Sequence, residues 1–375
     1  MRIIYGLLSL CFLIFFHELG HFLAARVFGV TVESFSIGFG PILFHKKRGT
    51  TDYRISLIPL GGYCGMKGEK DFFNSLEAGL DHIQAENDSL YGVHALKRIA
   101  IAFAGPFFNL LFAFFGFTLI AIIGYSYYSF SNKIILATDI YPELHSAAKD
   151  AGIMSGDEII RINNREIENF RDLMEEISQR PDEKIKLTVL RDKELLEFSL
   201  RTDIDKSTGS GKIGVIAADK EAEKYEAKRY SFFPAIIQGA KECGKIIFLT
   251  GKGIFSLFKG VDITKTVSGP ARIADMMGNI IKESFADGVR TGIVNLFNFC
   301  SIISISLFIM NLLPVPILDG GLILFALIEL ISRRKISPKV LYYIQFAGVA
   351  FIVMLFLIGL NGDINYFIDL IKGKK

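Results

Sequence analysis

The chain has 375 residues, of which 51% are apolar and 34 are phenylalanine, and its formal net charge at neutral pH is +3. This length allows two or three domains, and the apolar fraction is high for a soluble protein and ordinary for a membrane protein. The small net charge predicts no nucleic-acid partner. The four cysteines lie far apart without a Cys-x-x-Cys pair, which argues against a disulfide framework or a thiolate metal site.

The first long apolar segment, residues 3–25, contains the sequence His17-Glu18-Leu19-Gly20-His21. It is long enough to cross a bilayer, and we interpret it as a retained transmembrane helix, because no small-residue cleavage site precedes the motif. On a helix, His17 and His21 share one face with Cβ atoms roughly 5–6 Å apart, close enough to bind one metal ion. Glu18 lies about 100° further round the helix and flanks that ion.

His-Glu-x-x-His on a helix is the zinc-hydrolase pattern, in which two imidazoles hold Zn²⁺ and the glutamate accepts a proton from the attacking water. The alternative is two unrelated histidines on a helix. Unpaired ionisable groups in hydrocarbon cost about 2.5–3.5 kcal/mol each, which disfavours that alternative. We therefore predict one zinc ion per chain, with His17 and His21 as ligands and Glu18 as the catalytic base.

Four segments are free of charge, or nearly so, over enough residues to span a membrane: 3–25, 99–124, 291–318 and 340–362. A fifth apolar segment, 231–258, is interrupted by charged residues, which favours an amphipathic helix on the membrane or on other helices. Basic residues concentrate in the short loops 26–98 and 333–339, which predicts that these loops are cytoplasmic and that 125–290 is extracytoplasmic. The basic tail, Lys372, Lys374 and Lys375, weakly favours the opposite orientation.

The region between the first two spans predicts β structure. Residues 32–41 and 51–60 alternate apolar and polar positions, the first ends at Gly-Pro and the second precedes Gly61-Gly62, as in a hairpin or small sheet. This sheet either packs under the helices as a cytoplasmic subdomain or offers an exposed edge that holds an extended peptide. Residues 71–89 are polar and predict a mobile loop.

The outer region contains a recognisable unit. Ala151-Gly152 and Ser155-Gly156-Asp157 are followed by an alternating strand, a turn at Asn163-Asn164 and a helix over 170–179. Further strands are predicted at 185–190, 195–200 and 213–216. The stretch resembles a bacterial PDZ domain, which implies a groove for an extended peptide; the alternative is a small β domain that acts as a spacer or steric filter.

A second polar constellation follows the third span, in the sequence Asn311-Leu-Leu-Pro-Val-Pro-Ile-Leu-Asp319-Gly-Gly321. Two prolines break the helix, which is tolerated at membrane depth where backbone lines a cavity. Asp319 supplies the third ligand that a catalytic zinc needs, because two crossings separate it from His21 and bring it to the same side of the membrane. The alternative is a helix-end aspartate that faces the cytosol. Asn311 either orients substrate or is a structural amide.

Two weaker signals remain. In Gly105-Pro106-Phe-Phe-Asn109, the proline predicts a kink and Asn109 a bond to a neighbouring helix, with substrate binding as the alternative. The stretch 267–273, with a Ser-Gly-Pro sequence, predicts a bend.

These motifs together resemble the site-2 protease family of intramembrane zinc metalloproteases, in particular the bacterial RseP-type enzymes with a PDZ insert. The resemblance implies that His17, His21 and Asp319 bind Zn²⁺, that Glu18 is the catalytic acid and base, and that the first-loop β structure associates with the membrane. Gly61 and Gly62, with Asn311 and Asn109, are then candidate substrate-binding residues. The implied substrates are single-pass membrane proteins, such as anti-sigma factors or signal-peptide remnants, after an earlier cut outside. The chain has one PDZ-like unit where the best-known members have two.

The predicted fold class is therefore a polytopic α-helical membrane protein with about four transmembrane helices, a membrane-associated β-hairpin or sheet and an inserted extracytoplasmic PDZ-like α+β domain. We expect it in the bacterial cytoplasmic (inner) membrane, in contact with the lipid bilayer. The predicted order is: transmembrane helix 1 (1–30), β region and polar loop (31–97), transmembrane helix 2 (98–124), PDZ-like domain (125–216), amphipathic helices and connector (217–290), transmembrane helix 3 (291–321), cytoplasmic loop (322–339), and transmembrane helix 4 with the basic tail (340–375).

Two other functions are compatible with parts of this pattern. A metal transporter or metal-sensing scaffold, with the PDZ-like unit recruiting partners, needs neither Glu18 nor an open coordination position. A zinc protease anchored in the membrane but acting on soluble substrates shares the metal site and differs only in substrate.

Overall fold

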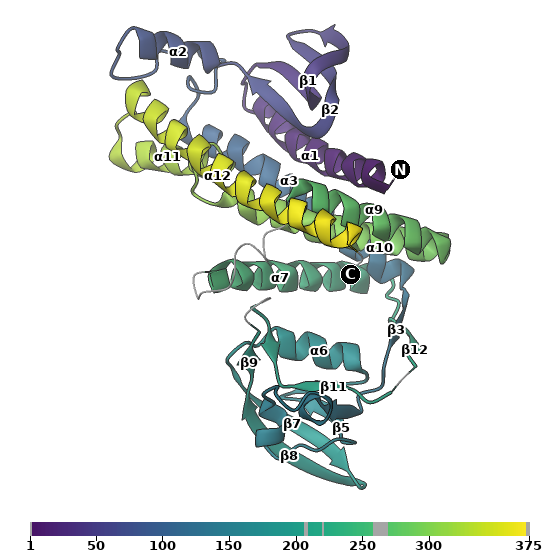
Figure 1. Cartoon of the computed structure of the whole chain (residues 1–375). Helices are drawn as coiled ribbons and strands as arrows, with labels where there is room; N and C mark the ends of the chain where they lie inside the picture. The colour runs from purple at the N-terminus through teal and green to yellow at the C-terminus, as the bar shows by residue number, and fades with distance from the viewer. Residues whose placement is uncertain (1, 206–208, 220, 258–268, 373–375) are drawn as a thin grey trace. The chain divides into compact units, whose positions relative to one another are not determined.

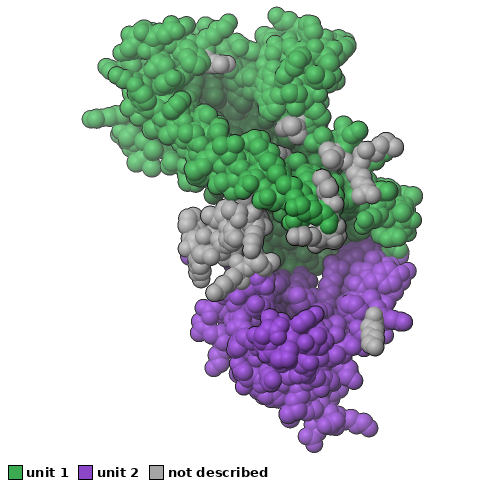
Figure 2. Space-filling model, in the orientation of Figure 1, with its two compact units in different colours: residues 1–123, 230–250, 267–375 green, residues 124–229, 251–266 purple. Residues whose placement is uncertain are grey.

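The computed structural model describes residues 2–205, 209–219, 221–257 and 269–372. The chain forms two compact units, coloured separately in Figure 2. Unit 1 comprises residues 1–123, 230–250 and 267–375, and unit 2 comprises 124–229 and 251–266. Because the chain leaves unit 1 and returns to it, segments far apart in the sequence build the same helical unit.

Unit 1 consists mainly of long helices (Figure 1). They are α1 (Arg2–Val27), α3 (Ala95–Ile123), the first part of α7 (Phe232–Leu257), α9 (Pro270–Ala286), α10 (Val289–Leu312), α11 (Asp319–Ser332) and α12 (Pro338–Ile371). Among the described residues, four stretches are long and apolar enough to cross a membrane: Ile4–Val27, Ala95–Ile123, Val289–Leu312 and Pro338–Leu370. The prediction of a polytopic membrane protein with about four spans is confirmed, and α7 is not one of the four.

Helix α3 is the centre of unit 1, since it packs against α1, α10 and α11. Small residues allow the close approach: a Cβ on Gly20 of α1 would collide with the Ala104 carbonyl of α3, and one on Gly116 of α3 would collide with Ser301 of α10. A buried apolar cluster then joins α1, α3, α9 and α10 through Leu13, Phe112, Met277 and Cys300. These contacts fix the first and third predicted spans on either side of the second.

The chain breaks between α10 and α11. Helix α10 ends at Leu312 and α11 begins at Asp319, with Pro314 and Pro316 between them. Proline lacks the N–H and clashes with the preceding turn, so an uninterrupted helix is excluded here. The predicted loop 322–339 is largely helix instead, because its apolar first part continues α11 to Ser332, where Arg333 in the left-handed region ends it.

The hairpin predicted in the first loop is present as β1 (Val32–Arg48) and β2 (Thr51–Met66). Residues Ser34 to Ile37 of β1 pair with Asp52 to Ile55 on one side and with Gly62 to Gly65 on the other. Within the described residues no other strand joins this sheet, so the last segment of β2 is an edge.

The predicted polar loop 71–89 begins with a helix, α2 (Glu69–Glu77). Phe72, on this helix, is buried in a cluster with Ile83 and Leu341, and Leu76 packs against it. Because most of the segment is polar, this short apolar face is not apparent from the sequence. The helix is stabilised by its contact with α12.

Unit 2 is built around a four-stranded antiparallel sheet in the order β6-β5-β7-β8, with helix α6 (Phe170–Ser178). Its strands are β5 (Glu158–Ile162), β6 (Arg165–Glu166), β7 (Lys184–Arg191) and β8 (Glu194–Arg201). The pairs β11–β4, β10–β9 and β12–β3 and two short helices complete the unit: β3 (Ser126–Ser129), β4 (Ile134–Leu136), α4 (Ala137–Ile140), α5 (Ala147–Asp150), β9 (Asp203–Ile204), β10 (Gly211–Lys212), β11 (Val215–Ala217) and β12 (Glu223–Glu226). The alternating apolar residues of β5 and β7 and the inner face of α6 form one buried core.

Two sequence predictions fall partly outside the described residues. Val267 and Ser268 of the predicted bend, and Lys374 and Lys375 of the basic tail, lie there. The described part of the bend starts α9, where the backbone N–H groups of Gly269 and Ala271 donate to the buried Asp363 carboxylate of α12 at 2.8 and 3.0 Å.

Candidate metal centre

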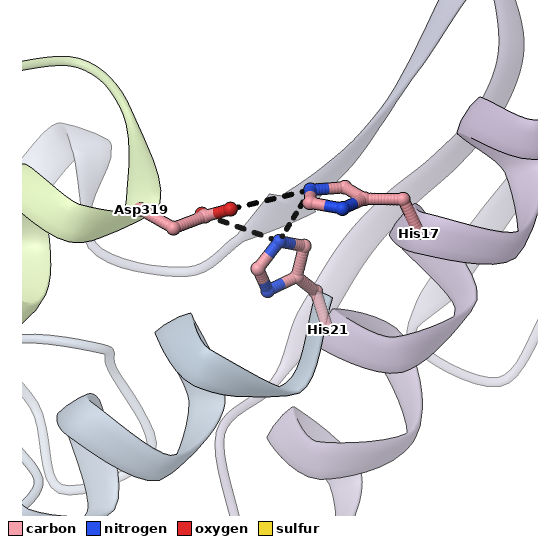
Figure 3. A group of neighbouring side chains, drawn as sticks. All are labelled: His17, His21 and Asp319. Carbon is pink, nitrogen blue, oxygen red and sulfur yellow. Dashed lines mark hydrogen bonds and ion pairs between the residues drawn. The ribbon is translucent and has the colours of Figure 1, made fainter. Parts of the chain in front are cut away.

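Three side chains from two helices converge in unit 1 (Figure 3). The Nε2 atoms of His17 and His21 lie 3.1 Å apart. Each lies 3.2 Å from one carboxylate oxygen of Asp319, which is 298 residues from His21 in the sequence. The histidines are one turn apart on α1, and Asp319 is the first residue of α11. The structure therefore has Asp319 close to the two histidines, as the number of crossings predicts.

The donor set fits a zinc ion. Two imidazole nitrogens and a carboxylate are typical protein ligands of a catalytic zinc site, which keeps a fourth position open. Both histidines are buried, with exposed fractions of 8% and 6%. The Nδ1–H of His21 donates to the carbonyl oxygen of Ile101 at 2.8 Å, so its Nε2 carries the lone pair that faces the other two ligands. Within the described residues this is the one group of three potential ligands so placed.

Glu18 lies beside this cluster and borders the same cavity, which has a volume of about 610 Å³. A Cβ built on Gly62 would lie 3.6 Å from Glu18 Cγ, so the edge segment of β2 passes over this carboxylate. Tyr63, Cys64 and Met66 of that segment line the cavity. A carboxylate, three potential metal ligands and an unpaired strand edge thus border one cavity.

Other charged residues in the wall of the cavity are paired. Arg98 of α3 forms an ion pair with Glu329 of α11, whose second oxygen accepts from the Ile336 N–H at 3.1 Å. Lys67 donates to Asp88 and Glu86 at 2.7 Å each, and these bonds, the one to Asp88 first, raise the pKa of the Lys67 ammonium. Arg98 and Lys67 therefore already have carboxylate partners within the protein.

Cys64 does not belong to the metal ligands. Burial raises the pKa of its thiol to about 12, and the nearby charge of Glu18 acts in the same direction. Among the described residues, the group of potential ligands whose atoms lie within 4.8 Å of one another does not include this sulfur.

The predicted substrate-binding residues lie in different surroundings. Asn311, in the last turn of α10, lines the cavity. Gly61 and Gly62 are buried in β2, and a side chain at Gly61 would collide with the ring of Phe39. Asn109 is fully buried, with its side chain 3.0 Å from His17 Nδ1, and is not among the residues that line the cavity. The roles of all four in substrate binding stay predictions.

Other residues at this site were not found from the sequence. The carbonyl of Ile101 holds His21, yet a backbone oxygen leaves no mark in an amino-acid sequence. Ile317, two residues before Asp319, has φ 91°, a conformation that a β-branched residue rarely adopts and that costs on the order of 1–3 kcal/mol. Such outliers collect at sites where the surrounding structure imposes them, and this one directs the chain into Asp319.

Gly105 is required by the close approach of α3 to His21. A Cβ at this position would overlap the imidazole ring around Nε2, the atom that faces the other ligands. We expect Gly105→Ala to displace the ring and weaken zinc binding by about 10–100-fold, in the range found when the surroundings of a metal ligand are disturbed. Chelator competition on the purified protein measures this.

Gly244→Ala is the matched control, because a Cβ at Gly244 of α7 meets no atom within 4 Å. It should leave zinc affinity unchanged. Equal zinc affinity in Gly105→Ala and the wild type would contradict the assigned packing.

Comparisons with known proteins extend over nearly the whole chain. The model of peptidase family M50 matches residues 5–355. A protein of Treponema pallidum named "Putative zinc metalloprotease" is 35% identical and aligns with 98% of this chain and 99% of its own length. Proteins so named from Campylobacter jejuni and Helicobacter pylori are 35% and 32% identical, each over 96% of this chain and over 92% and 99% of their own lengths.

Proposed function

The chain belongs to peptidase family M50, the site-2 protease family of zinc metalloproteases, and from this premise we propose that it hydrolyses peptide bonds in or next to the transmembrane segment of single-pass membrane proteins. The observation that carries the proposal is the position of the site. His17, Glu18 and His21 lie inside a candidate membrane span, Ile4–Val27, and border a cavity. A protease that cuts soluble substrates has no need to place its catalytic carboxylate at that depth, where charged groups are costly.

We assign the zinc ligands to His17, His21 and Asp319. When bound, zinc supplies a Lewis acid that polarises the scissile carbonyl and makes water more acidic. Glu18 accepts the proton of the attacking water and donates it to the leaving amine. Asn311, in the wall of the same cavity, donates its amide N–H to the substrate backbone or to the developing oxyanion.

Substrate is bound in extended form along the edge of β2. In a helix each carbonyl already accepts a hydrogen bond and is shielded by its own turn, so the segment to be cut must first unwind. The edge segment, with Gly61 and Gly62 at its start, passes over Glu18 and offers backbone groups for strand addition. Glycine allows close approach of two backbones, which supports a substrate contact at Gly62.

We assign unit 2 to a PDZ-like domain that binds an extended peptide on the extracytoplasmic side. Support comes from its strand and helix order and from the charge asymmetry of the short loops. The similar proteins are bacterial, which supports the cytoplasmic (inner) membrane as its location and regulated intramembrane proteolysis, after an earlier outer cut, as its role. Anti-sigma factors and signal-peptide remnants are the proposed substrate classes. The family match favours this enzymatic function over a metal transporter or scaffold.

The test uses the purified full-length protein in detergent or liposomes with two substrates: a single-span reporter and a water-soluble unfolded protein of equal length. We expect cleavage of the reporter within or beside its span and little cleavage of the soluble protein. Efficient cleavage of the soluble protein alone would refute intramembrane proteolysis while leaving the metalloprotease assignment in place.

The need for unwinding gives a further prediction about substrates. Two glycines in place of two alanines beside the cut site lower the helix stability of the reporter by about 1 kcal/mol each. We expect kcat/KM to rise by up to about 30-fold, as the barrier includes unwinding. A control reporter carries the two glycines at the far end of its span. Equal rates for all three reporters would mean that unwinding is not part of the barrier.

A further inference from the structure

The ring nitrogens of His17 and His21 that point away from the metal centre have partners on the same helix. His21 Nδ1 lies 2.8 Å from the Ile101 carbonyl oxygen, and His17 Nδ1 lies 3.0 Å from Nδ2 of the Asn109 side-chain amide. Both partners belong to α3. A neutral imidazole carries one N–H, so the partner of Nδ1 decides whether Nε2 has a lone pair.

For His21 the tautomer is settled by chemistry. A carbonyl oxygen can only accept, so Nδ1 carries the proton and Nε2 is free to bind a metal ion. For His17 either tautomer can be bonded, because an amide offers both a donor and an acceptor. If the amide nitrogen faces the ring, it donates to Nδ1, the proton sits on Nε2, and that atom cannot bind zinc.

The two ends of a side-chain amide are nearly equal in size and shape, so both orientations fit the same space. With the nitrogen toward His17, Asn109 Oδ1 is buried without a hydrogen-bond partner. With the oxygen toward His17, the NH₂ group occupies the buried position that Oδ1 would otherwise take. Packing therefore does not determine the orientation of the amide. Metal binding determines it, because His17 Nε2 needs a lone pair to bind zinc.

We propose that Asn109 is a positioning residue: its Oδ1 accepts a hydrogen bond from His17 Nδ1–H and thereby holds His17 in the tautomer whose Nε2 binds zinc. The proposal rests on the assignment of His17 as a zinc ligand. It gives Asn109 a role away from the substrate, consistent with its full burial.

Helix α3 presents this support as a single stripe. Ile101, Gly105 and Asn109 are spaced by four residues and share one face. The first bonds His21, the second leaves room for its ring, and the third bonds His17. Ser304 of α10 donates from its Oγ to the Asn109 carbonyl at 2.8 Å and anchors α3 from behind. This explains two residues of the Gly-Pro-Phe-Phe-Asn sequence: Gly105 and Asn109 allow one face of α3 to pack against the two imidazoles.

The test compares zinc affinities of the full-length protein by chelator competition, without any measurement of proteolysis. Asn109→Ala removes the acceptor and should weaken zinc binding by about 10–100-fold. Asn109→Asp has the same shape and, as a carboxylate, can only accept, so it should keep the wild-type affinity within a few-fold. Rescue by aspartate distinguishes an acceptor role from a donor role, because alanine and aspartate both remove the amide NH₂ and only aspartate keeps the oxygen.

Ser304→Ala is the matched control. It breaks the contact behind Asn109 without touching the imidazole, and we expect unchanged zinc affinity. The proposal is overturned if Asn109→Ala binds zinc like the wild type, if Asn109→Asp loses as much affinity as Asn109→Ala, or if Ser304→Ala loses as much. The unfolding midpoint of each metal-free variant shows whether a loss of zinc affinity comes from misfolding. If Asn109→Ala misfolds, the zinc affinity of Asn109→Asp alone tests the proposal.

These outcomes are separate from those of the proposed function. A wild type that binds zinc tightly and cuts no membrane reporter would refute intramembrane proteolysis and leave the role of Asn109 intact. If the wild type cuts the reporter and Asn109→Ala has unaltered zinc affinity, the proposed function is supported and the role of Asn109 is refuted.

Discussion

Glu18→Gln should abolish cleavage of a membrane reporter while the protein retains its zinc. The substitution keeps the size of the side chain and removes the carboxylate that borders the cavity next to His17 in the sequence. General acid and base catalysis contributes typically 10²–10⁴-fold, so we expect kcat to fall by at least about 100-fold. The measurement is a time course of reporter cleavage with zinc content determined on the same preparation.

The control is Glu33→Gln, which makes the same chemical change at an exposed position on β1, close in the sequence to the site but outside the cavity. It should cleave at the wild-type rate. Continued cleavage by Glu18→Gln would show that another group takes the proton. Loss of zinc in Glu18→Gln would instead assign Glu18 to the metal ligands.

Asp319→Asn should lose the zinc itself. The carboxylate lies 3.2 Å from each histidine Nε2 and is the only anion of the three proposed ligands. We expect a loss of zinc affinity greater than the roughly 10–100-fold that changes around a ligand cause, with cleavage lost in parallel. Zinc should no longer protect the variant against unfolding. For the wild type, free zinc at 100 times its Kd should add about 2.7 kcal/mol to the free energy of unfolding.

The matched control is Asp81→Asn, an exposed aspartate of the first loop. Thermal unfolding with and without zinc, together with bound zinc per chain, gives the result. Full zinc occupancy and wild-type cleavage in Asp319→Asn would mean that the third ligand is another residue, and that the approach of α11 to α1 serves packing only.

Much of the site could be predicted because its determinants are local or topological. The spacing of His17 and His21 fixes them on one face of α1, since four residues make about one turn. The approach of Asp319 followed from counting apolar segments, because two crossings return the chain to the same side of a bilayer. Length and charge alone set this count, so the 298 residues between the motifs did not obscure it.

Prediction was poorest where polar composition hid helical contacts. Helix α2 forms in a polar segment because Phe72 and Leu76 pack against a cluster with Leu341 of α12, and no pattern within residues 71–89 contains that partner. The loop predicted over 322–339 rests on the basic residues at its end, and the structure has helix α11 as far as Ser332 in its first part. The apolar residues of that first part are the local signal for this helix.

By itself the sequence determined the class of the protein and the number of candidate spans, and it predicted which residues bind the metal and that they lie on the same side of the membrane. Only the tertiary structure decided how the histidines are held. The support comes from Ile101, Gly105 and Asn109 of α3, through a carbonyl oxygen, the lack of a side chain and a side-chain amide. The physical reason is that ligand identity is written in residue type and spacing, whereas ligand orientation depends on backbone groups and close contacts from other helices, which exist only once the helices are packed.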